Sequence, residues 1–364
     1  MRAPRWFLWL VCAAIVLWGL YAGRAYLVPI AIALVLYSLL AALIDWITRV
    51  KLGPLSIPRP VASLIGLVII AYGLFLMVSV MSSQVEAVIA ASPRYIARIQ
   101  GLLSEAAEFF DRDIAEDLQR ALADLNLTAR IPSLVGSAGA TVTTISLIIL
   151  YMGFMFIERG VFQKKLGRLF SDGEDAERIE GVILSISDNV QRYFTIKLFV
   201  SALTGLTSYI ILKSLGLDFA ETWALLTVLL NFIPNIGSVI ATILPAIVAL
   251  VQFDTLAPFL IIAIGVSAIQ FTIGSFVEPA LLGRQLNLSP LVIILSLTFW
   301  AFVWGIIGMF LSVPIMVIVL IVCSHIPAWR PVAIILSRDG RLPVNDEPGA
   351  EAGGRDPSSV RSEP

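Results

Sequence analysis

The sequence predicts an all-α, polytopic membrane protein with about eight transmembrane helices, and three observations lead to this class. Of the 364 residues, 58% are hydrophobic and 14% are charged, whereas soluble domains carry about 25% charged residues. The mean hydropathy is +0.91. The charged residues are concentrated between long apolar runs, and a run of about 20 apolar residues is what a spanning helix needs.

The composition also excludes several classes of function. A net charge of −1 gives no basic field for nucleic acid. The only histidine is His325, and the only cysteines, Cys12 and Cys323, stand at opposite ends of the chain, so neither a metal site nor a Cys/His nucleophile is expected. The sequence has no Walker-type loop, no HExxH and no G-x-S-x-G motif, which mark ATP-driven pumps, zinc proteases and hydrolases. We therefore expect a protein that is not an enzyme and has no cofactor.

The N-terminal part of the chain holds four predicted spans. The first apolar run follows Arg2 and Arg5, as the apolar part of a signal peptide would. We interpret it as a retained first helix, because Arg24 stands at the place of cleavage and a second run follows at once. Residues 1–81 then contain spans one to three and residues 137–157 contain span four, in the runs Trp6–Ala22, Leu27–Ile44, Pro60–Met81 and Ser137–Ile157.

Two polar segments follow the third and fourth spans. Residues 82–136 form an extracytoplasmic amphipathic helical segment, in which Ser92 and Pro93 suit an N-cap and a first helical turn. This segment either lies on the membrane or on neighbouring helices, or it serves oligomer contact or gating of the outer mouth. Residues 158–193 form the second segment, a cytoplasmic amphipathic connector that leads into the fifth span.

Residues 194–323 are predicted to form a C-terminal transmembrane bundle with broken helices. Two of its apolar runs are longer than one span needs, so each of these either spans once or forms a re-entrant hairpin; they are Trp223–Phe253 and Leu291–Val322. The other two runs are Phe194–Leu215 and Ala257–Val277. Residues 324–364 form a cytoplasmic tail, which is predicted to be disordered after about residue 342 because it is poor in apolar residues.

Lysine and arginine set the expected orientation, since short cytoplasmic loops carry an excess of both. Four basic groups lie around residues 2–5, 49–59, 159–168 and 330–341. An eight-span path with both termini in the cytoplasm places all four groups inside. Converting only one of the two long runs into a hairpin would reverse the orientation of everything after it.

The candidate substrate path begins at an interruption of the run Trp223–Phe253. Hydrocarbon offers no partner to the backbone groups that a break releases, so such breaks occur inside protein or beside a water-filled cavity, and transporters build binding sites from them. The residues at the break either contact the solute or satisfy the released backbone, and the two roles are compatible. They are Asn231, Pro234, Asn235, Gly237 and Ser238. The last run has a second interruption, at Gly305, Gly308 and Pro314.

Glu278 is an ionisable residue at the end of the run Ala257–Val277. Ionisable groups inside a membrane are costly and are therefore candidates for function. Gln270 lies roughly 80° from Glu278 around a regular α-helix, near enough to line the same cavity. Glu278 is expected either to pair with Arg284 or Lys213 at the outer interface, or to take part in a substrate or proton path.

Three elements of the sequence together resemble one family. They are FIPNIG at residues 232–237, EPALLG at residues 278–283 and GIIGMFLSVP at residues 305–314. With nearly the whole chain up to about Arg341, they resemble the AI-2E family of transporters, which are bacterial inner-membrane proteins linked to export of the quorum-sensing signal autoinducer-2. The chain departs from the common pattern at Ser289, where a His is frequent, and at residues 299–301, where a Gly pair is frequent and where aromatic side chains would narrow a passage.

The broken helices and the resemblance together predict a secondary transporter of the bacterial inner membrane. The resemblance implies export of a small polar organic solute similar to autoinducer-2, with a proton or sodium ion as the coupling ion, and a homo-oligomer. An alternative within the same class is a sodium/proton antiporter. A function of another class is a non-transporting membrane scaffold that recruits partners through its outer and inner helices. The broken helices favour transport, because a scaffold has no need of released backbone groups at membrane depth.

Overall fold

The computed structural model describes residues 5–49, 51–52, 55–109, 138–169, 173–283, 287–340 and 342. Among these residues nearly all regular structure is helical, which confirms the predicted all-α class. The chain divides into two compact units, and each is described by itself. The first unit is Met1–Lys165 with Gln191–Gly283, and the second is Leu166–Val190 with Arg284–Pro364.

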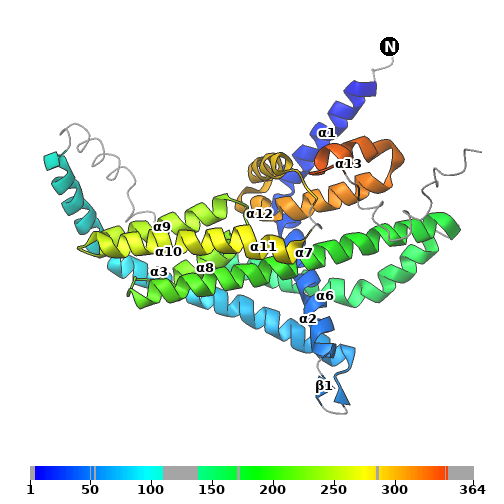
Figure 1. Ribbon diagram of the computed structural model, residues 1–364. Helices are drawn as coiled ribbons and strands as arrows, with labels where there is room; N and C mark the ends of the chain where they lie inside the picture. The colour runs from blue at the N-terminus through cyan, green and yellow to red at the C-terminus, as the bar shows by residue number, and fades with distance from the viewer. Residues whose placement is uncertain are drawn as a thin grey trace, which may run out of the picture. The chain divides into compact units, whose positions relative to one another are not determined.

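The first unit contains most of the helices drawn in Figure 1. In chain order they are α1 (Arg5–Ala22), α2 (Arg24–Arg49), α3 (Arg59–Phe109), α6 (Ala138–Leu169), α7 (Gly173–Ser214), α8 (Ala220–Leu230), α9 (Ile236–Gln252), α10 (Leu256–Thr272), the π-helix η1 (Ile273–Val277) and α11 (Glu278–Leu282). The end of α6 and the beginning of α7 belong to the second unit. A short antiparallel ribbon connects α2 to α3 and consists of β1 (Lys51–Leu52) and β2 (Leu55–Ser56).

Helices α2, α3 and α6 share a hydrophobic core. Leu40, Ile44 and Ile47 recur on one face of α2, and they pack with Ala62 of α3 and Met152 of α6. All five side chains are buried. The spacing of the large apolar residues of α2 therefore decides which of its faces turns inward.

Helix α3 continues far beyond the predicted third span. The prediction that a new helix begins at Ser92 is wrong, because α3 runs from Arg59 through Pro93 to Phe109 without a break. Proline removes one backbone hydrogen bond from a helix interior, yet the helix continues, and the side chains of the two residues after Pro93 both bond to Asp218. We call residues 82–109 the arm of α3. The remainder of the predicted segment, up to residue 136, lies outside the described residues.

Helix α7 joins two segments that the sequence predicts as separate. Residues 158–193 are predicted to be a connector, but α6 extends to Leu169 and α7 runs from Gly173 to Ser214. No helix boundary therefore lies at residue 193. The polar and apolar parts of α7 follow one another within a single helix because neither glycine nor proline interrupts the residues where they meet.

Helices α8 and α9 form a hairpin that folds the run Trp223–Phe253 back on itself. The beginning of α8 and the second half of α9 pack together in one core with α7 and α10, in which Ala220, Ala246 and Ala249 are buried together with Leu217, which precedes α8. At the turn, a Cβ atom on Gly237 would lie 1.7 Å from the carbonyl oxygen of Leu230. Only glycine lets the second helix begin so close to the end of the first. The run is therefore a helical hairpin and not one continuous helix.

The second unit contains α12 (Pro290–His325), the 3-10 helix η2 (Pro327–Trp329) and α13 (Arg330–Leu336). Helix α12 turns sharply at Gly305, whose φ of 66° and ψ of −142° are not helical. Ser296 lies before the turn and Ser312 after it, and Ser296 Oγ donates to the carbonyl of Ser312 at 3.3 Å. A straight helix would separate these residues by about 24 Å. The last apolar run is therefore a second helical hairpin.

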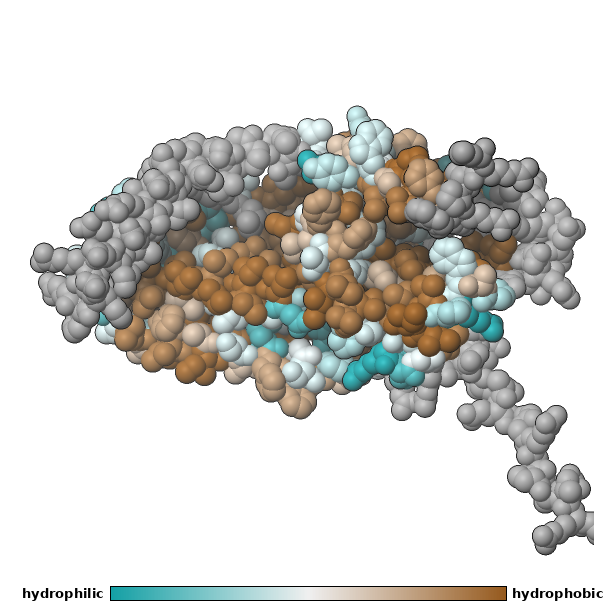
Figure 2. All heavy atoms as spheres, turned by 90° about the horizontal axis from the view of Figure 1, so that it is seen from above, coloured by the Kyte–Doolittle hydropathy of each residue, from teal (hydrophilic) through white to brown (hydrophobic). Residues whose placement is uncertain are grey.

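Large apolar side chains cover much of the protein surface. Figure 2 shows broad hydrophobic areas with few hydrophilic residues between them, which soluble proteins rarely expose. Within the described residues, five helical segments are long and apolar enough to cross a membrane by length and composition. They are Arg24–Arg49, Arg59–Ala91, Gly181–Ser214, Leu256–Leu282 and Pro290–His325. Together with the shorter apolar helices, they make this a multi-pass membrane protein.

Candidate functional site

A buried ion pair lies at the centre of the candidate site. Lys197 of α7 donates from Nζ to Oε1 of Glu278, the first residue of α11, and the two atoms are 2.5 Å apart. The Lys197 side chain is 6% exposed and the Glu278 side chain is 20% exposed. Ionisable groups within membrane helices are costly and mark the paths of substrates and ions. This pair is therefore the first candidate for function in the chain.

The pairing corrects the expected position of Glu278. The sequence predicts Lys213 or Arg284 as the partner at the outer interface, but Lys213 pairs with Glu221 at 2.7 Å, and Arg284 lies outside the described residues. Lys197 and Lys213 are about 24 Å apart along α7. Glu278 therefore lies near the end of the apolar part of α7 that is remote from Lys213.

The π-helix η1 sets the direction in which Glu278 points. Pro279 has no N–H for the carbonyl four residues before it, and the N–H of Glu278 instead bonds to the carbonyl of Ile273, five residues back. Because a π turn holds one residue more than an α turn, the path from Gln270 to Glu278 makes about two turns rather than about 2.2. Gln270 and Glu278 therefore lie on one face of the helix, not roughly 80° apart.

Lys197 begins a stripe of buried polar side chains along α7. Ser201, Thr204 and Ser208 follow at helical spacing, and all four residues are at most 5% exposed. Thr204 donates to the carbonyl of Val200. Ser208 Oγ is buried without a hydrogen-bond partner among the described residues, and the same holds for Nε2 of Gln270. Buried polar atoms without partners are rare in proteins, so these two groups are candidates to bind water or a polar solute.

The turn between α8 and α9 reaches this stripe. Asn231 donates from Nδ2 to Ser201 Oγ at 3.1 Å, one helical turn from Lys197. The close packing of α7 against α8 allows this approach. It requires glycine at position 205, because a Cβ atom there would lie 2.3 Å from the side chain of Val228. Asn231 is therefore the residue of the interrupted run that the structure brings to the site.

The other residues of the interruption shape the turn. Pro234 is half-buried, Gly237 is buried and Asn235 is exposed, with a φ of 60°. Ser238 Oγ donates to the carbonyl of Asn235 at 2.9 Å, and the N–H of Gly237 bonds to the carbonyl of Ile233 at 3.1 Å. These bonds satisfy the carbonyls of Ile233 and Asn235 and the N–H of Gly237 at the break. We therefore retain a contact with solute at these positions only as a prediction.

The second predicted interruption lies in the second unit. Gly305 forms the turn of α12, and a Cβ atom on Gly308 would lie 1.9 Å from the carbonyl oxygen of Trp300. Pro314 is buried inside the second half of the same helix. These three residues let the helix fold back on itself, and their predicted role in a substrate path stays a prediction.

Lys197 and Ser201 are candidates that the sequence analysis does not identify. Both lie within the predicted run Phe194–Leu215, which contains no proline and no predicted break. A signal was nevertheless present, because a lysine inside a span is followed by small hydroxyl residues 4, 7 and 11 positions later. That spacing places all of them on one helical face.

The polar groups of the ion pair, of the stripe on α7 and of its neighbours Asn231 and Gln270 bind rather than break bonds. They supply one ammonium, one carboxylate, amides and hydroxyls, which donate and accept hydrogen bonds. Within the described part of the chain, no group of three or more His, Cys, Asp or Glu that could hold a metal ion is found. A polar site between interrupted membrane helices, buried around an ion pair, is the arrangement of a helical membrane transporter.

Comparison with known proteins identifies the family within this class. The family model described as AI-2E family transporter matches residues 10–328. The chain therefore belongs to the AI-2E transporter family, as its motifs predict. It is a transport protein of this family.

Individual relatives match over most of their length. The AI-2 transport protein TqsA of Escherichia coli (strain K12) is 30% identical over 333 residues, which are 89% of this chain and 92% of TqsA. YhhT of the same organism is 27% identical over 84% of this chain and 86% of its own length. YueF of Bacillus subtilis (strain 168) is 26% identical over 80% of this chain and 81% of its own length. The names of YhhT and YueF refer to transport and to no solute.

Proposed function

We propose that this protein is a secondary transporter that exports a small polar organic solute, similar to autoinducer-2, across the bacterial inner membrane. The observation that carries the proposal is the ion pair between Lys197 and Glu278, which is buried beside the tip of an interrupted helical hairpin. The name of TqsA, which refers to AI-2 transport, supports this class of solute.

The chemistry of the site favours a neutral solute that carries hydroxyl or carbonyl oxygens. Lys197 and Glu278 neutralise each other while they are paired, so a solute with a net charge that enters the paired site would meet no unpaired counter-charge. Asn231, Gln270 and Ser208 offer groups that both donate and accept hydrogen bonds, and two of these groups have buried atoms without a partner in the described structure. A compact, hydroxyl-bearing molecule would supply those partners.

We further propose that the coupling ion acts at Glu278. A proton on the carboxylate, or a sodium ion beside it, competes with Lys197 for the same oxygen atoms. Either ion weakens the attraction that holds the ammonium. The released ammonium then donates to an oxygen of the solute, which links ion binding to solute binding. A sodium/proton antiporter would use the same pair without the solute.

Flux measurements in proteoliposomes test the proposal. Autoinducer-2 is the cargo, and a proton or a sodium gradient is imposed in separate experiments. We expect one gradient to accelerate flux through the wild-type protein, and we expect Lys197→Met/Glu278→Met to lower the rate at least tenfold. The matched control is Glu158→Gln/Lys165→Met, which removes an ion pair of 2.6 Å on the exposed surface of α6 and should leave flux unchanged.

Each other outcome is decisive. Sodium/proton exchange without flux of autoinducer-2 would show that the protein is a sodium/proton antiporter and that the proposed solute is wrong. Absence of both activities from folded wild-type protein would overturn the proposed cargo and the proposed coupling ions. If the folded Lys197→Met/Glu278→Met variant transported at the wild-type rate, the ion pair would have no role in transport.

A further inference from the structure

The arm of α3 is bonded to both connections that flank the α8–α9 hairpin. Arg94 donates to the carboxylate of Asp218, and the Tyr95 hydroxyl donates to the same carboxylate at 3.0 Å. One helical turn further along the arm, Arg98 pairs with Asp254 at 3.0 Å. Asp218 precedes α8 and Asp254 follows α9. The arm therefore holds the hairpin at its base, where both helices join the rest of the unit.

The two connections are also bonded to each other. Gln252, the last residue of α9, accepts at Oε1 from the backbone N–H of Asp218 at 2.7 Å. Its Nε2 donates to the carbonyl of Gly216 at 2.8 Å. The base of the hairpin is thus one bonded unit, and the arm contacts it from one side. We call the contacts of Arg94, Tyr95 and Arg98 with this base the clamp.

Arg94 and Tyr95 are protonated at neutral pH. Burial, together with the hydrogen bond to Asp218, raises the pKa of Tyr95 to about 12. The neighbouring Tyr95 and Asp218 also raise the pKa of Arg94. In each ion pair one partner is largely exposed, Arg94 in the first and Asp254 in the second, and pairs that water reaches stabilise weakly. Weak contacts of this kind can break and form again repeatedly, as a contact between moving helices requires.

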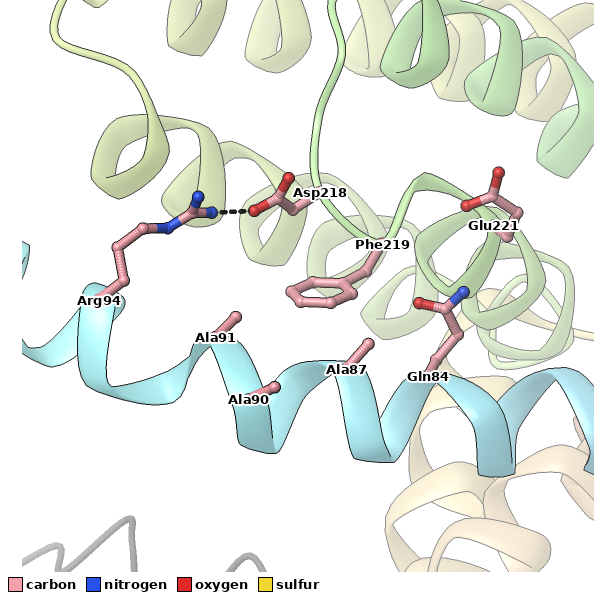
Figure 3. Close-up of a pocket in the computed structure, with 8 residues that line it drawn as sticks. All are labelled: Gln84, Ala87, Ala90, Ala91, Arg94, Asp218, Phe219 and Glu221. Atoms are coloured by element: carbon pink, nitrogen blue, oxygen red, sulfur yellow. Dashed lines mark hydrogen bonds and ion pairs between the residues drawn. The ribbon is translucent and has the colours of Figure 1, made fainter.

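Phe219 lies between the clamp and the first turn of α8 in a strained conformation. Its φ of 60° and ψ of 30° are left-handed, which is unusual for an aromatic residue. Its ring centre lies 6.4 Å from that of Tyr95. The ring lines an open cavity of about 610 Å³, and Figure 3 shows it facing the alanines of the arm. Such conformations persist where neighbours hold them, and the cavity leaves room for movement when the arm departs.

The other end of the hairpin contacts the transport site. The 17 residues of α9 extend for about 25 Å, and at the far end Asn231 bonds to Ser201 on the polar stripe of α7. A rotation of the hairpin about its base therefore moves Asn231 away from Ser201. A displacement at the clamp is transmitted along rigid helices to the site.

We propose that Arg94, Tyr95 and Arg98 are positioning residues for transport: they hold the base of the hairpin so that its tip covers Ser201, and opening of the clamp uncovers it. The link to transport rests on the proposed function. The position of the tip can be measured without any solute.

The reactivity of a cysteine at position 201 tests this inference. Ser201 is fully buried, so Ser201→Cys should react slowly with 2-aminoethyl methanethiosulfonate in a protein whose Cys12 and Cys323 are replaced by Ser. Adding Arg94→Ala/Arg98→Ala should raise the rate about tenfold. Arg94→Lys/Arg98→Lys keeps both charges and should restore most of the slow rate. Glu158→Ala/Lys165→Ala, which removes an exposed ion pair on α6, is the matched control and should have no effect.

A charge reversal keeps the test decisive if the alanine variant does not fold. Arg98→Asp should speed the reaction, and Arg98→Asp/Asp254→Arg should return it to the slow rate. Equal reactivity of the folded clamp variants and the parent protein would overturn the proposal, even if transport were normal. Absence of flux in the wild-type protein would instead overturn the proposed function and leave the reactivity result intact.

Discussion

Two charged residues in a membrane helix bundle depend on each other. Lys197 and Glu278 each lose hydration on burial, and their attraction offsets that cost only while both are present. Removing one partner leaves the other charge without compensation. Replacing both by apolar side chains of similar volume removes both costs. The effect of the pair on the stability of the protein and its role in transport can therefore be measured separately.

We expect Glu278→Gln to lower the free energy of unfolding by about 3 kcal/mol, because the ammonium of Lys197 stays buried without a counter-charge. Lys197→Met/Glu278→Met should restore the stability to within about 1 kcal/mol of the wild-type value, since no charge then remains. Thermal unfolding in detergent measures both changes. A double variant as unstable as Glu278→Gln would show that packing of these side chains, rather than their charges, stabilises the protein here.

Glu278 could be identified from the sequence, but its partner could not. A carboxylate beside a proline at the end of an apolar run is conspicuous, whereas the choice among Lys197, Lys213 and Arg284 depends on which helices are neighbours. The π turn before Glu278 adds a second difficulty. It shifts the helical phase by one residue, so the calculated angle to Gln270 is wrong whenever the helix is assumed regular.

At the scale of helices, the places where the chain breaks could be predicted, whereas the direction it takes after a break could not. The interruption near Pro234 and Gly237 and the one near Gly305 are visible as residues that helices disfavour. Whether the chain then continues across the membrane or returns depends on a contact between the two halves. In the α8–α9 hairpin, the backbone of Gly237 packs against the carbonyl of Leu230, and this contact is possible only because residue 237 has no side chain.

We expect Gly237→Ala to destabilise the protein by about 3 kcal/mol, because its Cβ atom would overlap the carbonyl oxygen of Leu230 and force the two helices apart. Gly153→Ala in α6 is the control. A Cβ atom there meets nothing within 4 Å, and alanine should stabilise the helix by about 0.5–1 kcal/mol. Thermal unfolding of both variants gives the comparison. A stable Gly237→Ala protein would contradict the close turn between α8 and α9.

At the scale of the whole molecule, the two hairpins change the expected path through the membrane. The eight-span path counts Trp223–Phe253 as one span and therefore puts Asp218 and Asp254 on opposite sides. The arm of α3 bonds to both residues, so they lie at the same end of the hairpin. Helix α8, with 11 residues, reaches only about 16 Å, roughly half of the hydrocarbon thickness. A re-entrant hairpin fits this length.

We therefore predict six spans and two re-entrant hairpins, with both termini in the cytoplasm. Two hairpins reverse the orientation twice, so the basic groups that fix the termini stay inside. The two paths differ at Thr255, an exposed residue beside Asp254. It is outside in the six-span path and inside in the eight-span path.

Thr255→Cys, in a background without Cys12 and Cys323, should react with a membrane-impermeant maleimide in intact spheroplasts as fast as Ser214→Cys does. Lys165→Cys should react only after lysis. If Thr255→Cys also required lysis, α8 and α9 would have to cross the membrane as one span.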